Sequence, residues 1–267
     1  MTASPSSHGD HQRVRGLGTA LVTGATAGIG FRFAEELAAR GHDLVLVARD
    51  TDRLSEVAAD LAERFAVRTE VLAADLTDRA AVDRVAARIG DADDPVELLV
   101  NNAGFGLKKR FEAADLEDEQ AQLDVLVVAV MRLSHAALRA MLPHKRGGIL
   151  NVSSVAAFLD GGTYSAAKAW VNSFSRWAAA EYAGDGVHVM ALCPGYVRTE
   201  FHQRMGVRQS APDFLWLEAT GLVHDALDDF DAGKVVSVPS LRYKAITTAA
   251  RVVPAGLQRR LTGRRAR

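Results

Sequence analysis

Short apolar runs alternate with longer amphipathic segments along most of this chain. The apolar runs are rich in valine, leucine and alanine, which is typical of strands buried on both faces of a sheet. The segments between them repeat apolar residues every three to four positions, as helices do. We therefore predict strands over 19–23, 44–48, 69–73, 96–100, 148–152, 187–192 and 233–239, and helices over 31–41, 52–64, 78–89, 116–141 and 164–183.

This alternation predicts an α/β fold, in which helices cover both faces of a doubly wound parallel sheet to give three layers. A chain of 267 residues is within the size of one such domain. No repeat or linker interrupts the pattern, so we predict one domain over 17–267, preceded by a polar, disordered arm over 1–16. Ligands bind such sheets beyond the carboxyl ends of the strands. The polar or special residues that fall at those ends are Thr23, Arg49, Asp75, Asn102, Ser154 and Pro194.

A glycine-rich turn separates the first predicted strand from the first helix. Its sequence is Gly24-Ala25-Thr26-Ala27-Gly28-Ile29-Gly30. Strand, glycine turn and helix together place a pyrophosphate on free backbone N–H groups at a helix N-terminus. Gly24 would supply the tight turn, Gly28 the close approach of the backbone, and Gly30 the close packing of helix on strand. The spacing is G-x-x-x-G-x-G rather than G-x-G-x-x-G, and a glycine turn without a ligand is the alternative interpretation.

Ser154, Tyr164 and Lys168 lie close together in the sequence, just after the strand predicted over 148–152. Tyr164 and Lys168 are one helical turn apart in an alanine-rich segment, so the phenol and the ammonium share one face. A tyrosine hydroxyl titrates near ~10, and a nearby cation lowers that pKa toward the range that is useful at neutral pH. Ser154 would hold a carbonyl oxygen while Tyr164 gives or takes the proton. The same spacing also arises by chance in many helices.

Together these motifs resemble the compact, single-domain branch of the short-chain dehydrogenase/reductase family. The segments that carry the resemblance are Thr23 to Gly30, Asn101 to Gly104, Ser154 with Tyr164 and Lys168, and Pro194-Gly195, and they extend from about residue 19 to about residue 200. The resemblance implies a Rossmann fold and an oxidoreductase that moves hydride between a nicotinamide cofactor and a small carbonyl or secondary alcohol. It also implies a homodimer or homotetramer and no metal.

The resemblance assigns roles to individual residues of this chain. Tyr164 is the acid/base, Ser154 holds the substrate oxygen, and Lys168 orients the cofactor ribose and lowers the pKa of the tyrosine. The implied cofactor-binding residues are Gly24, Thr26, Ala27, Gly28, Ile29, Gly30, Arg49, Asp75, Leu76, Asn102, Ala103, Gly104, Tyr164, Lys168, Pro194, Gly195, Val197 and Thr199.

Arg49 bears on which nicotinamide cofactor is bound. An acid at the end of the second strand would accept hydrogen bonds from the ribose of NAD. Here that strand ends in Ala48-Arg49, and a guanidinium can pair with the 2′-phosphate of NADP. We therefore expect NADP(H) to be preferred over NAD(H). Asp50 could instead pair with Arg49, Arg49 could be a solvated surface residue, and Ala27 stands where many NADP-preferring members have a second base.

Two of the implied contacts have plain structural alternatives. Asp75-Leu76 resembles the family's adenine contact, but Asp75 could equally cap the helix that is predicted to begin near Asp78. Asn102-Ala103-Gly104 resembles the segment beside the adenine-side ribose, and an ordinary turn is the alternative. Thr199 is placed to bond the carboxamide or a phosphate.

Two features depart from the family pattern. The family places an asparagine in the long middle helix, where it holds a relay water, but Leu126 occupies that position and no asparagine occurs between Asn102 and Asn151. A leucine side chain can neither donate nor accept a hydrogen bond, whereas Gln122, one turn earlier, can. The segment 155–163 is also shorter than is common, which shortens the loop over the nicotinamide. Leu126 leaves open a second function, a cofactor-binding sensor or scaffold with weak or no catalysis.

Composition excludes several other functions. The net charge of −1 indicates no electrostatic footprint for nucleic acid. The longest uninterrupted apolar stretch, 125–131, is too short for a transmembrane segment. Cys193 is the sole cysteine and lies in an apolar run, so we expect a buried residue rather than a nucleophile, and a reducing, cytoplasmic compartment.

The last quarter of the chain carries two further expectations. The segment 199–217, with Met205, Phe214, Leu215 and Trp216, resembles a substrate lid, although core packing of these side chains is an equal alternative. The tail over 258–267 is basic. We interpret it as a solvated end, with contact to anionic lipid or an acidic partner as the alternative.

Overall fold

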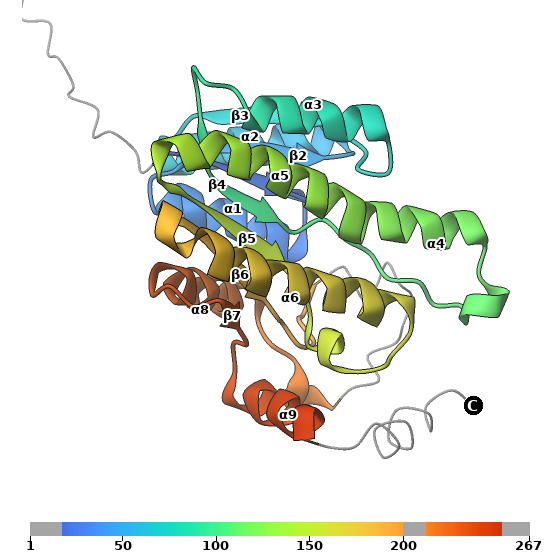
Figure 1. Cartoon of the computed structure of the whole chain (residues 1–267). Coiled ribbons are helices and arrows are strands. Elements are labelled where there is room, and N and C mark those ends of the chain that lie inside the picture. Colours follow the sequence, from blue (N-terminus) through green and yellow to red (C-terminus); the bar gives the residue numbers. More distant parts are fainter. Residues whose placement is uncertain (1–17, 200–211, 253–267) are drawn as a thin grey trace, which may run out of the picture.

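Seven parallel strands form one sheet in the computed structural model of this chain, which describes residues 18–199 and 212–252 (Figure 1). Their order is β3-β2-β1-β4-β5-β6-β7, so the order reverses between β1 and β4. The strands are β1 (Thr19–Thr23), β2 (Asp43–Ala48), β3 (Thr69–Ala73), β4 (Val96–Asn101), β5 (Gly147–Val152), β6 (Val187–Leu192) and β7 (Val236–Ser237). Ligands of such sheets bind at the point of reversal, beyond the carboxyl ends of the strands.

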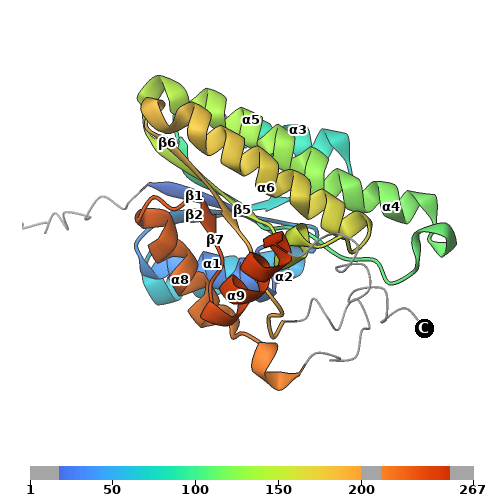
Figure 2. The same cartoon turned by 60° about the horizontal axis from the view of Figure 1, so that its bottom comes forward.

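Helices cover both faces of this sheet, as Figure 2 shows most clearly. One face carries α1 (Gly28–Ala39), α2 (Thr51–Phe65) and α8 (Ala219–Asp231), and the other carries α3 (Arg79–Ile89), α5 (Val130–Met141) and α6 (Thr163–Tyr182). Two further helices, α4 (Leu116–Leu123) and α9 (Leu241–Val252), lie toward the carboxyl ends of the strands. The predicted fold, a doubly wound parallel sheet in three layers, is confirmed.

The two faces of the sheet have separate apolar cores, because successive side chains of a strand point to opposite faces. Leu21, Val45 and Leu99 pack in the core beneath α3, α5 and α6. Their neighbours Val22 and Leu46 pack in the core beneath α1, α2 and α8. Apolar residues on both sides explain why the strands are continuous apolar runs rather than alternating ones.

Three elements differ from the predicted ones. The first helix begins at Gly28, three residues before the predicted 31, and the Phe31 N–H already donates to the Ala27 carbonyl at 3.2 Å. The last strand is only Val236–Ser237 instead of 233–239, since α8 ends just before it and Pro239 cannot donate to a neighbouring strand. The long middle helix contains a π-helical segment over Asp124–Ala129, with α4 before it and α5 after it. Such segments are frequent at functional sites.

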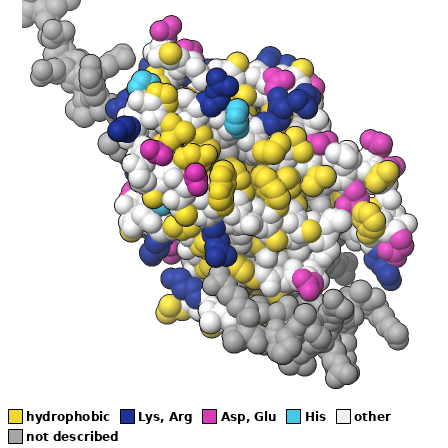
Figure 3. Space-filling view, in the orientation of Figure 1, with side chains coloured by type: hydrophobic (Ala, Val, Ile, Leu, Met, Phe, Trp, Pro, Cys, Tyr) yellow, Lys and Arg dark blue, Asp and Glu magenta, His cyan; other side chains and the backbone are white. Residues whose placement is uncertain are grey.

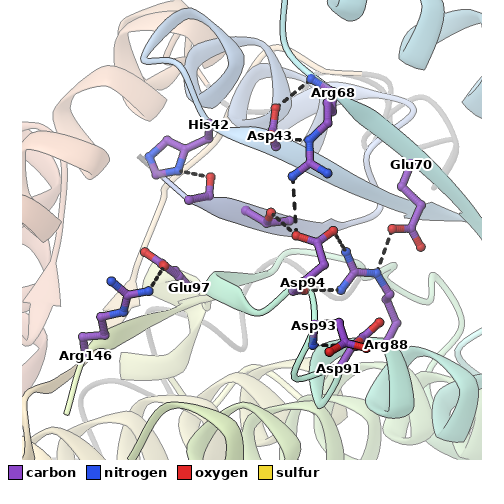
Figure 4. Close-up of polar contacts among 12 residues, drawn as sticks. His42, Asp43, Arg68, Glu70, Arg88, Asp91, Asp93, Asp94, Glu97 and Arg146 are labelled. Carbon is purple, nitrogen blue, oxygen red and sulfur yellow. Dashed lines mark hydrogen bonds and ion pairs between the residues drawn. The ribbon is translucent and has the colours of Figure 1, made fainter. Parts of the chain in front are cut away.

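An ion-pair network joins the amino-terminal ends of the strands, at the end of the sheet opposite the predicted ligand rim (Figure 4). Arg88 of α3 donates to Glu70 of β3 and to Asp94 before β4, with N–O distances of 2.7 and 2.8 Å. Arg68 pairs with Asp43 at 2.7 Å and reaches Asp94 at 3.5 Å. These contacts tie β2, β3, β4 and α3 together away from the carboxyl ends.

The middle helix is long enough to be tested as a candidate membrane segment. The continuous helix Leu116–His144 is long and apolar enough to cross a bilayer by length and composition alone, although its longest unbroken apolar stretch is short. Half of its most apolar window is buried inside the fold, against the sheet and the neighbouring helices. A core helix passes the same test, so this is weak evidence for a membrane span.

Several sequence-based expectations fall outside the described residues. These are the arm over 1–16, the basic tail over 258–267, and the part of the predicted lid between Thr199 and Pro212, which includes Met205. Of the described lid residues, Phe214 is exposed, whereas Trp216 is buried and packs against Tyr196 at 5.4 Å between ring centroids. Core packing is therefore the better interpretation of Trp216.

Candidate active site

The glycine turn wraps tightly between β1 and α1. Gly24 and Gly28 have φ angles of +70° and +58°, a region that favours glycine. The Gly24 N–H donates to the Val47 carbonyl at 2.7 Å, which anchors the turn on β2. A Cβ on Gly30 would lie 2.2 Å from the Gly24 carbonyl oxygen and 2.3 Å from Asn102 Nδ2. Only glycine at position 30 lets the helix approach the turn this closely.

Hydrogen bonds between Asn102 and Thr23 fix the start of the glycine turn. The Asn102 side chain donates to the Thr23 carbonyl at 2.8 Å, and its own N–H donates to the Thr23 hydroxyl at 2.9 Å. The Ala103 N–H also donates to that hydroxyl, at 3.0 Å. The double asparagine is therefore more than an ordinary turn, because it joins the ends of β1 and β4. Thr23 was not assigned a role from sequence, although it stands at the head of the glycine motif.

The N-terminus of α1 is suited to an anion. Its N-cap residue, Ala27, offers no side-chain acceptor, and the first turn carries no acid. Backbone N–H groups at a helix start, together with the helix dipole, attract phosphate groups. Thr199 comes from the loop after β6, and its Cβ lies 3.2 Å from the point where a Cβ on Gly28 would stand. These residues fit the pyrophosphate of a dinucleotide.

Ser154 and Tyr164 meet at the carboxyl end of β5. Ser154 follows the strand and begins a 3₁₀ turn over Val155–Phe158, where its hydroxyl accepts the Ala156 N–H at 3.1 Å. Tyr164 lies in the first turn of α6, and its hydroxyl shares a hydrogen bond with that of Ser154. The Nζ atom of Lys168 lies 5.8 Å from the centre of the tyrosine ring. The three residues predicted as catalytic are thus together.

Buried polar contacts set the position of α6 on the sheet. Ser153 donates its hydroxyl to the Lys168 carbonyl at 3.0 Å, and Lys168 Nζ donates to the Val152 carbonyl at 2.7 Å. Deeper in the fold, the Asn151 amide donates to the Ser175 hydroxyl at 3.0 Å. All these groups are buried, so leaving any of them unpaired would cost about 1–3 kcal/mol. They fix the register of α6 against β5.

The expected lowering of the Tyr164 pKa by Lys168 is not what the structure gives. Burial raises the pKa of Tyr164 to about 12, and the hydrogen bond with Ser154 only partly opposes this. Lys168 is occupied by the Val152 carbonyl and lies over the ring rather than beside the hydroxyl. Tyr164 therefore stays protonated at neutral pH, which suits a proton donor better than a base.

Burial also lowers the pKa of Lys168, to about 8, with the nearby Cys193 opposing that shift. Below pH 8 both the folded and the unfolded chain hold this proton, and the folded state carries the full penalty of burying the cation. Between pH 8 and the ordinary value of 10.5 the unfolded chain binds more protons, so stability rises with pH.

We expect Lys168→Met to raise the free energy of unfolding at pH 7 by about 2 kcal/mol. Removing the buried cation stabilises the fold by about 3 kcal/mol, and losing the hydrogen bond to Val152 offsets about 1 kcal/mol of that gain. Denaturant titrations at pH 7 and pH 10 would check this, and the gain should shrink at the higher pH. Lys244→Met, at an exposed position, should change little at either pH. A variant that is less stable at both pH values would contradict the expectation.

Arg49 and Asp75 lie side by side at the ends of adjacent strands. Arg49 Nη1 is 3.9 Å from Asp75 Oδ2, and the Arg49 side chain is 73% exposed. Asp50 does not take this arginine, because its carboxylate caps α2 by accepting the Arg53 N–H at 3.1 Å. The other oxygen of Asp75 accepts from Thr77, so it shapes a turn.

The proposed capping role of Asp75 is wrong, since Asp78 caps α3 through the Ala80 N–H. Leu76 is buried and packs in the core on the α3 side. An adenine contact at Leu76 would therefore have to come from its backbone.

Leu126 is fully buried beside the lysine. A Cβ on Gly104 would lie 2.8 Å from Leu126 Cδ2 and 3.9 Å from Lys168 Nζ, so both side chains reach the same point. Leu126 therefore lies close to Lys168, as expected for the position at which the family places its asparagine. Gln122 is also buried. Its amide nitrogen donates to the Phe105 carbonyl and its amide oxygen accepts from the Thr163 hydroxyl, both at 3.4 Å. Gln122 therefore faces the start of α6 rather than the lysine.

The loop after β6 completes the rim. The Pro194 carbonyl accepts the Val155 N–H at 2.9 Å, which ties this loop to the segment after Ser154. Val197 is buried in a small apolar cluster with Ile29 and Leu222, so only its backbone can face a ligand. Cys193 is buried as expected, and its thiol contacts the Asn172 amide oxygen at 3.2 Å.

Sequence reasoning missed Tyr243, whose ring covers Gly195 from α9. No motif marks this tyrosine. Its partners lie 28 and 47 residues away along the chain, so only the fold could reveal it.

An open surface hollow of about 600 Å³ lies between the 3₁₀ turn and the start of α6, lined by residues such as Phe158, Asp160, Ser165 and Ala169. None of the catalytic candidates lines it. Within 18–199 and 212–252, no group of three or more His, Cys, Asp or Glu residues could hold a metal ion.

Comparison with known proteins gives consistent results. A family model described as short chain dehydrogenase matches residues 18–209. The chain is 36% identical over 194 residues to the very-long-chain 3-oxoacyl-CoA reductase of Anas platyrhynchos, a match covering 69% of this chain and 62% of that protein. It is 35% identical over 208 residues to sulfoacetaldehyde reductase 2 of Chromohalobacter salexigens, covering 76% and 82%. The chain thus spans about three fifths of the length of the avian and bovine 3-oxoacyl-CoA reductases it matches.

Solved structures show the same likeness. A short-chain dehydrogenase from Sphingobium yanoikuyae in complex with NADPH has a TM-score of 0.82 and 35% identity, over 88% of this chain and 94% of that one. A bulky-bulky ketone specific alcohol dehydrogenase from Comamonas testosteroni has a TM-score of 0.78 and 31% identity, over 88% and 93%.

Proposed function

Because this chain belongs to the short-chain dehydrogenase/reductase family, we propose that it moves hydride between NADP(H) and a carbonyl or secondary alcohol substrate. The observation that carries the proposal is the contact between the Ser154 and Tyr164 hydroxyls, beside Lys168, on the same rim as the glycine turn. Two hydroxyls this close to each other can both donate hydrogen bonds to the same carbonyl oxygen.

The residues of the site divide the chemistry among them. The bound nicotinamide supplies or accepts the hydride. Ser154 donates a hydrogen bond to the carbonyl oxygen, and Tyr164 donates its proton there as negative charge develops. A Tyr164 pKa of about 12 keeps the phenol protonated at neutral pH, so it is in the form that can donate a proton. Lys168 orients the cofactor ribose from its buried position on α6.

Consumption of NADPH tests the proposal directly. The panel of compounds to be tested should include aldehydes, 3-oxoacyl thioesters and bulky ketones, because relatives and similar structures are named for such compounds. Turnover of any one class at neutral pH supports an enzyme. Tight NADPH binding with no turnover across the whole panel would instead support a sensor or scaffold.

Arg49 supports a preference for NADP(H). We expect NADPH to bind more tightly than NADH, and Arg49→Ala to erase most of the difference. A charged hydrogen bond contributes about 1.5–3 kcal/mol, so the loss should be about 10- to 100-fold. The loose, exposed pair with Asp75 leaves the guanidinium available to a phosphate at little cost. Fluorescence titration with both cofactors would measure it.

Arg146→Ala is the matched control, because this exposed arginine lies at the opposite end of the sheet (Figure 4). Equal affinities for NADPH and NADH in the unsubstituted protein would show that Arg49 gives no preference for NADPH.

The leucine at position 126, where the family has an asparagine, is the observation that favours weak or absent catalysis. We expect the protein to turn over measurably, and Leu126→Asn to increase kcat by less than the ~10²–10⁴-fold that a whole acid/base group contributes. Leu126 is fully buried against Gly104, so an unsatisfied amide there would lower the free energy of unfolding by about 1–3 kcal/mol.

Turnover and denaturant titration must therefore be measured together, with Leu126→Met as the control that keeps the position apolar. If Leu126→Asn folds, binds NADPH and gains no turnover, the missing asparagine does not limit the reaction.

An apolar surface supports assembly into a homodimer or homotetramer. Figure 3 shows apolar side chains gathered on the face formed by α5 and α6. Met131 of α5 and Trp177 of α6 are 45% and 53% exposed, and Leu123 of α4 is 45% exposed. Light scattering should give a mass of at least two chains, and Trp177→Lys should lower it. A monomer at micromolar concentration would contradict this.

A cytoplasmic location, to be checked by cell fractionation, fits the single, buried cysteine.

A further inference from the structure

Tyr243 of α9 reaches back to the loop that follows β6. Its side chain is 3% exposed, and its hydroxyl makes two hydrogen bonds. It accepts the Tyr196 N–H at 3.0 Å and donates to the Leu215 carbonyl at 2.7 Å. One hydroxyl therefore joins two segments that are separated by 200–211 in the sequence. Burial raises the pKa of Tyr243, so the donated bond persists into the alkaline range.

The tyrosine ring also sets the shape of the loop. A Cβ on Gly195 would lie 1.9 Å from Cζ of Tyr243, which is far inside van der Waals contact. The ring therefore lies flat on the Gly195 backbone, and position 195 must stay glycine as long as Tyr243 is present. Because this ring is buried and bonded at its far end, it cannot swing aside cheaply.

The two joined segments hold each other through a short strand-like pairing. Val197 bridges Leu217, the Leu217 N–H donates to the Tyr196 carbonyl at 2.8 Å, and the Arg198 N–H donates to the Leu217 carbonyl at 2.9 Å. Arg198 also pairs with Glu218 at 3.1 Å. Residues 196–199 are thus fixed on one side by 215–218 and from beneath by Tyr243.

These same residues end against the glycine turn. Val197 packs on Ile29, and Thr199 stands beside Gly28 at the start of α1. Any shift of the loop therefore changes the distance between Thr199 and the N-terminus of α1. Both hydrogen bonds of the Tyr243 hydroxyl go to the segments on either side of this loop, at Tyr196 and Leu215.

We propose that Tyr243 is a positioning residue that fixes loop 195–199 and thereby sets the affinity of the site for the nicotinamide cofactor. This inference rests on the proposed function, since it concerns the same cofactor site. Tyr243 acts on the loop that ends beside the N-terminus of α1, so its effect falls on cofactor binding rather than on the chemical step. A residue that only filled the core would change stability alone.

Tyr243→Phe removes one hydroxyl and keeps the ring. We expect its dissociation constant for NADPH to rise on the order of tenfold, because two hydrogen bonds of the loop are lost. We expect kcat at saturating NADPH to stay within about twofold of the unsubstituted value. Tyr182→Phe is the matched control, because this tyrosine of α6 lies on the aromatic face near Trp177, away from the site.

A reciprocal pair of variants tests the ring contact. Gly195→Ala should weaken NADPH binding because its methyl group collides with the ring, and Gly195→Ala combined with Tyr243→Ala should regain part of the lost affinity. The fluorescence of Trp216 offers a readout that needs no turnover, because this tryptophan adjoins Leu215 and packs on Tyr196. In a background with Trp170→Phe and Trp177→Phe, Tyr243→Phe should shift its emission.

The outcomes separate this inference from the proposed function. Unchanged NADPH affinity in Tyr243→Phe, with tight binding by the unsubstituted protein, overturns the inference and leaves the proposed function standing. A lower kcat with unchanged affinity also overturns it, because the residue would then act on chemistry. An unsubstituted protein that binds no NADPH overturns both.

Discussion

Replacing Tyr164 by phenylalanine should lower kcat by roughly 10²–10⁴-fold while leaving NADPH affinity nearly unchanged. The substitution removes one hydroxyl and keeps the ring against Lys168. Without that hydroxyl, the side chain that meets Ser154 can no longer donate a proton to the substrate oxygen. The loss should appear in kcat and kcat/KM equally, because the proton is transferred only in the transition state.

The pH dependence of the unsubstituted protein gives an independent check. Since the pKa of Tyr164 is about 12, the phenol stays protonated across the neutral range, and its own titration should not limit reduction there. Alcohol oxidation needs the phenolate as base and should therefore increase toward high pH. Tyr182→Phe should leave both profiles unchanged. Appreciable reduction by Tyr164→Phe would assign the acid to another group.

Replacing Gly30 by alanine should abolish measurable NADPH binding and lower the free energy of unfolding by about 3 kcal/mol. The new methyl carbon would lie 2.2 Å from the Gly24 carbonyl oxygen and 2.3 Å from Asn102 Nδ2. Both are held by the backbone and by hydrogen bonds, so the turn must open. Misplacement by about 1 Å is enough to cost ~10²-fold in a positioned site.

Gly221 offers a matched control in another helix. It lies exposed in α8, where an added Cβ meets no atom within 4 Å. Gly221→Ala should therefore stabilise the protein by about 0.5–1 kcal/mol through helix propensity, with unchanged cofactor affinity. Calorimetry and NADPH titration on both variants would measure the contrast. Normal NADPH binding by Gly30→Ala would show that the glycine turn is not the cofactor site.

The sequence was sufficient for those features whose causes are local. Each buried strand is a continuous apolar run, and each helix repeats apolar residues at its own period, so the layered α/β fold followed from patterning. Ser154, Tyr164 and Lys168 lie within one strand end, one turn and one helix, so their proximity was also predictable. Boundaries were less so, as the early start of α1 and the shortness of β7 show.

The features that only the tertiary structure decided depend on groups distant in sequence. The direction of the Tyr164 pKa shift follows from burial and not from its spacing to Lys168. Arg49 faces Asp75 because adjacent strands bring the two together, whereas its sequence neighbour Asp50 is taken by a helix cap. Tyr243 meets Gly195 only because α9 folds back over the rim. Local patterning determines which elements form, but burial and long-range contacts determine what each side chain in the site can do.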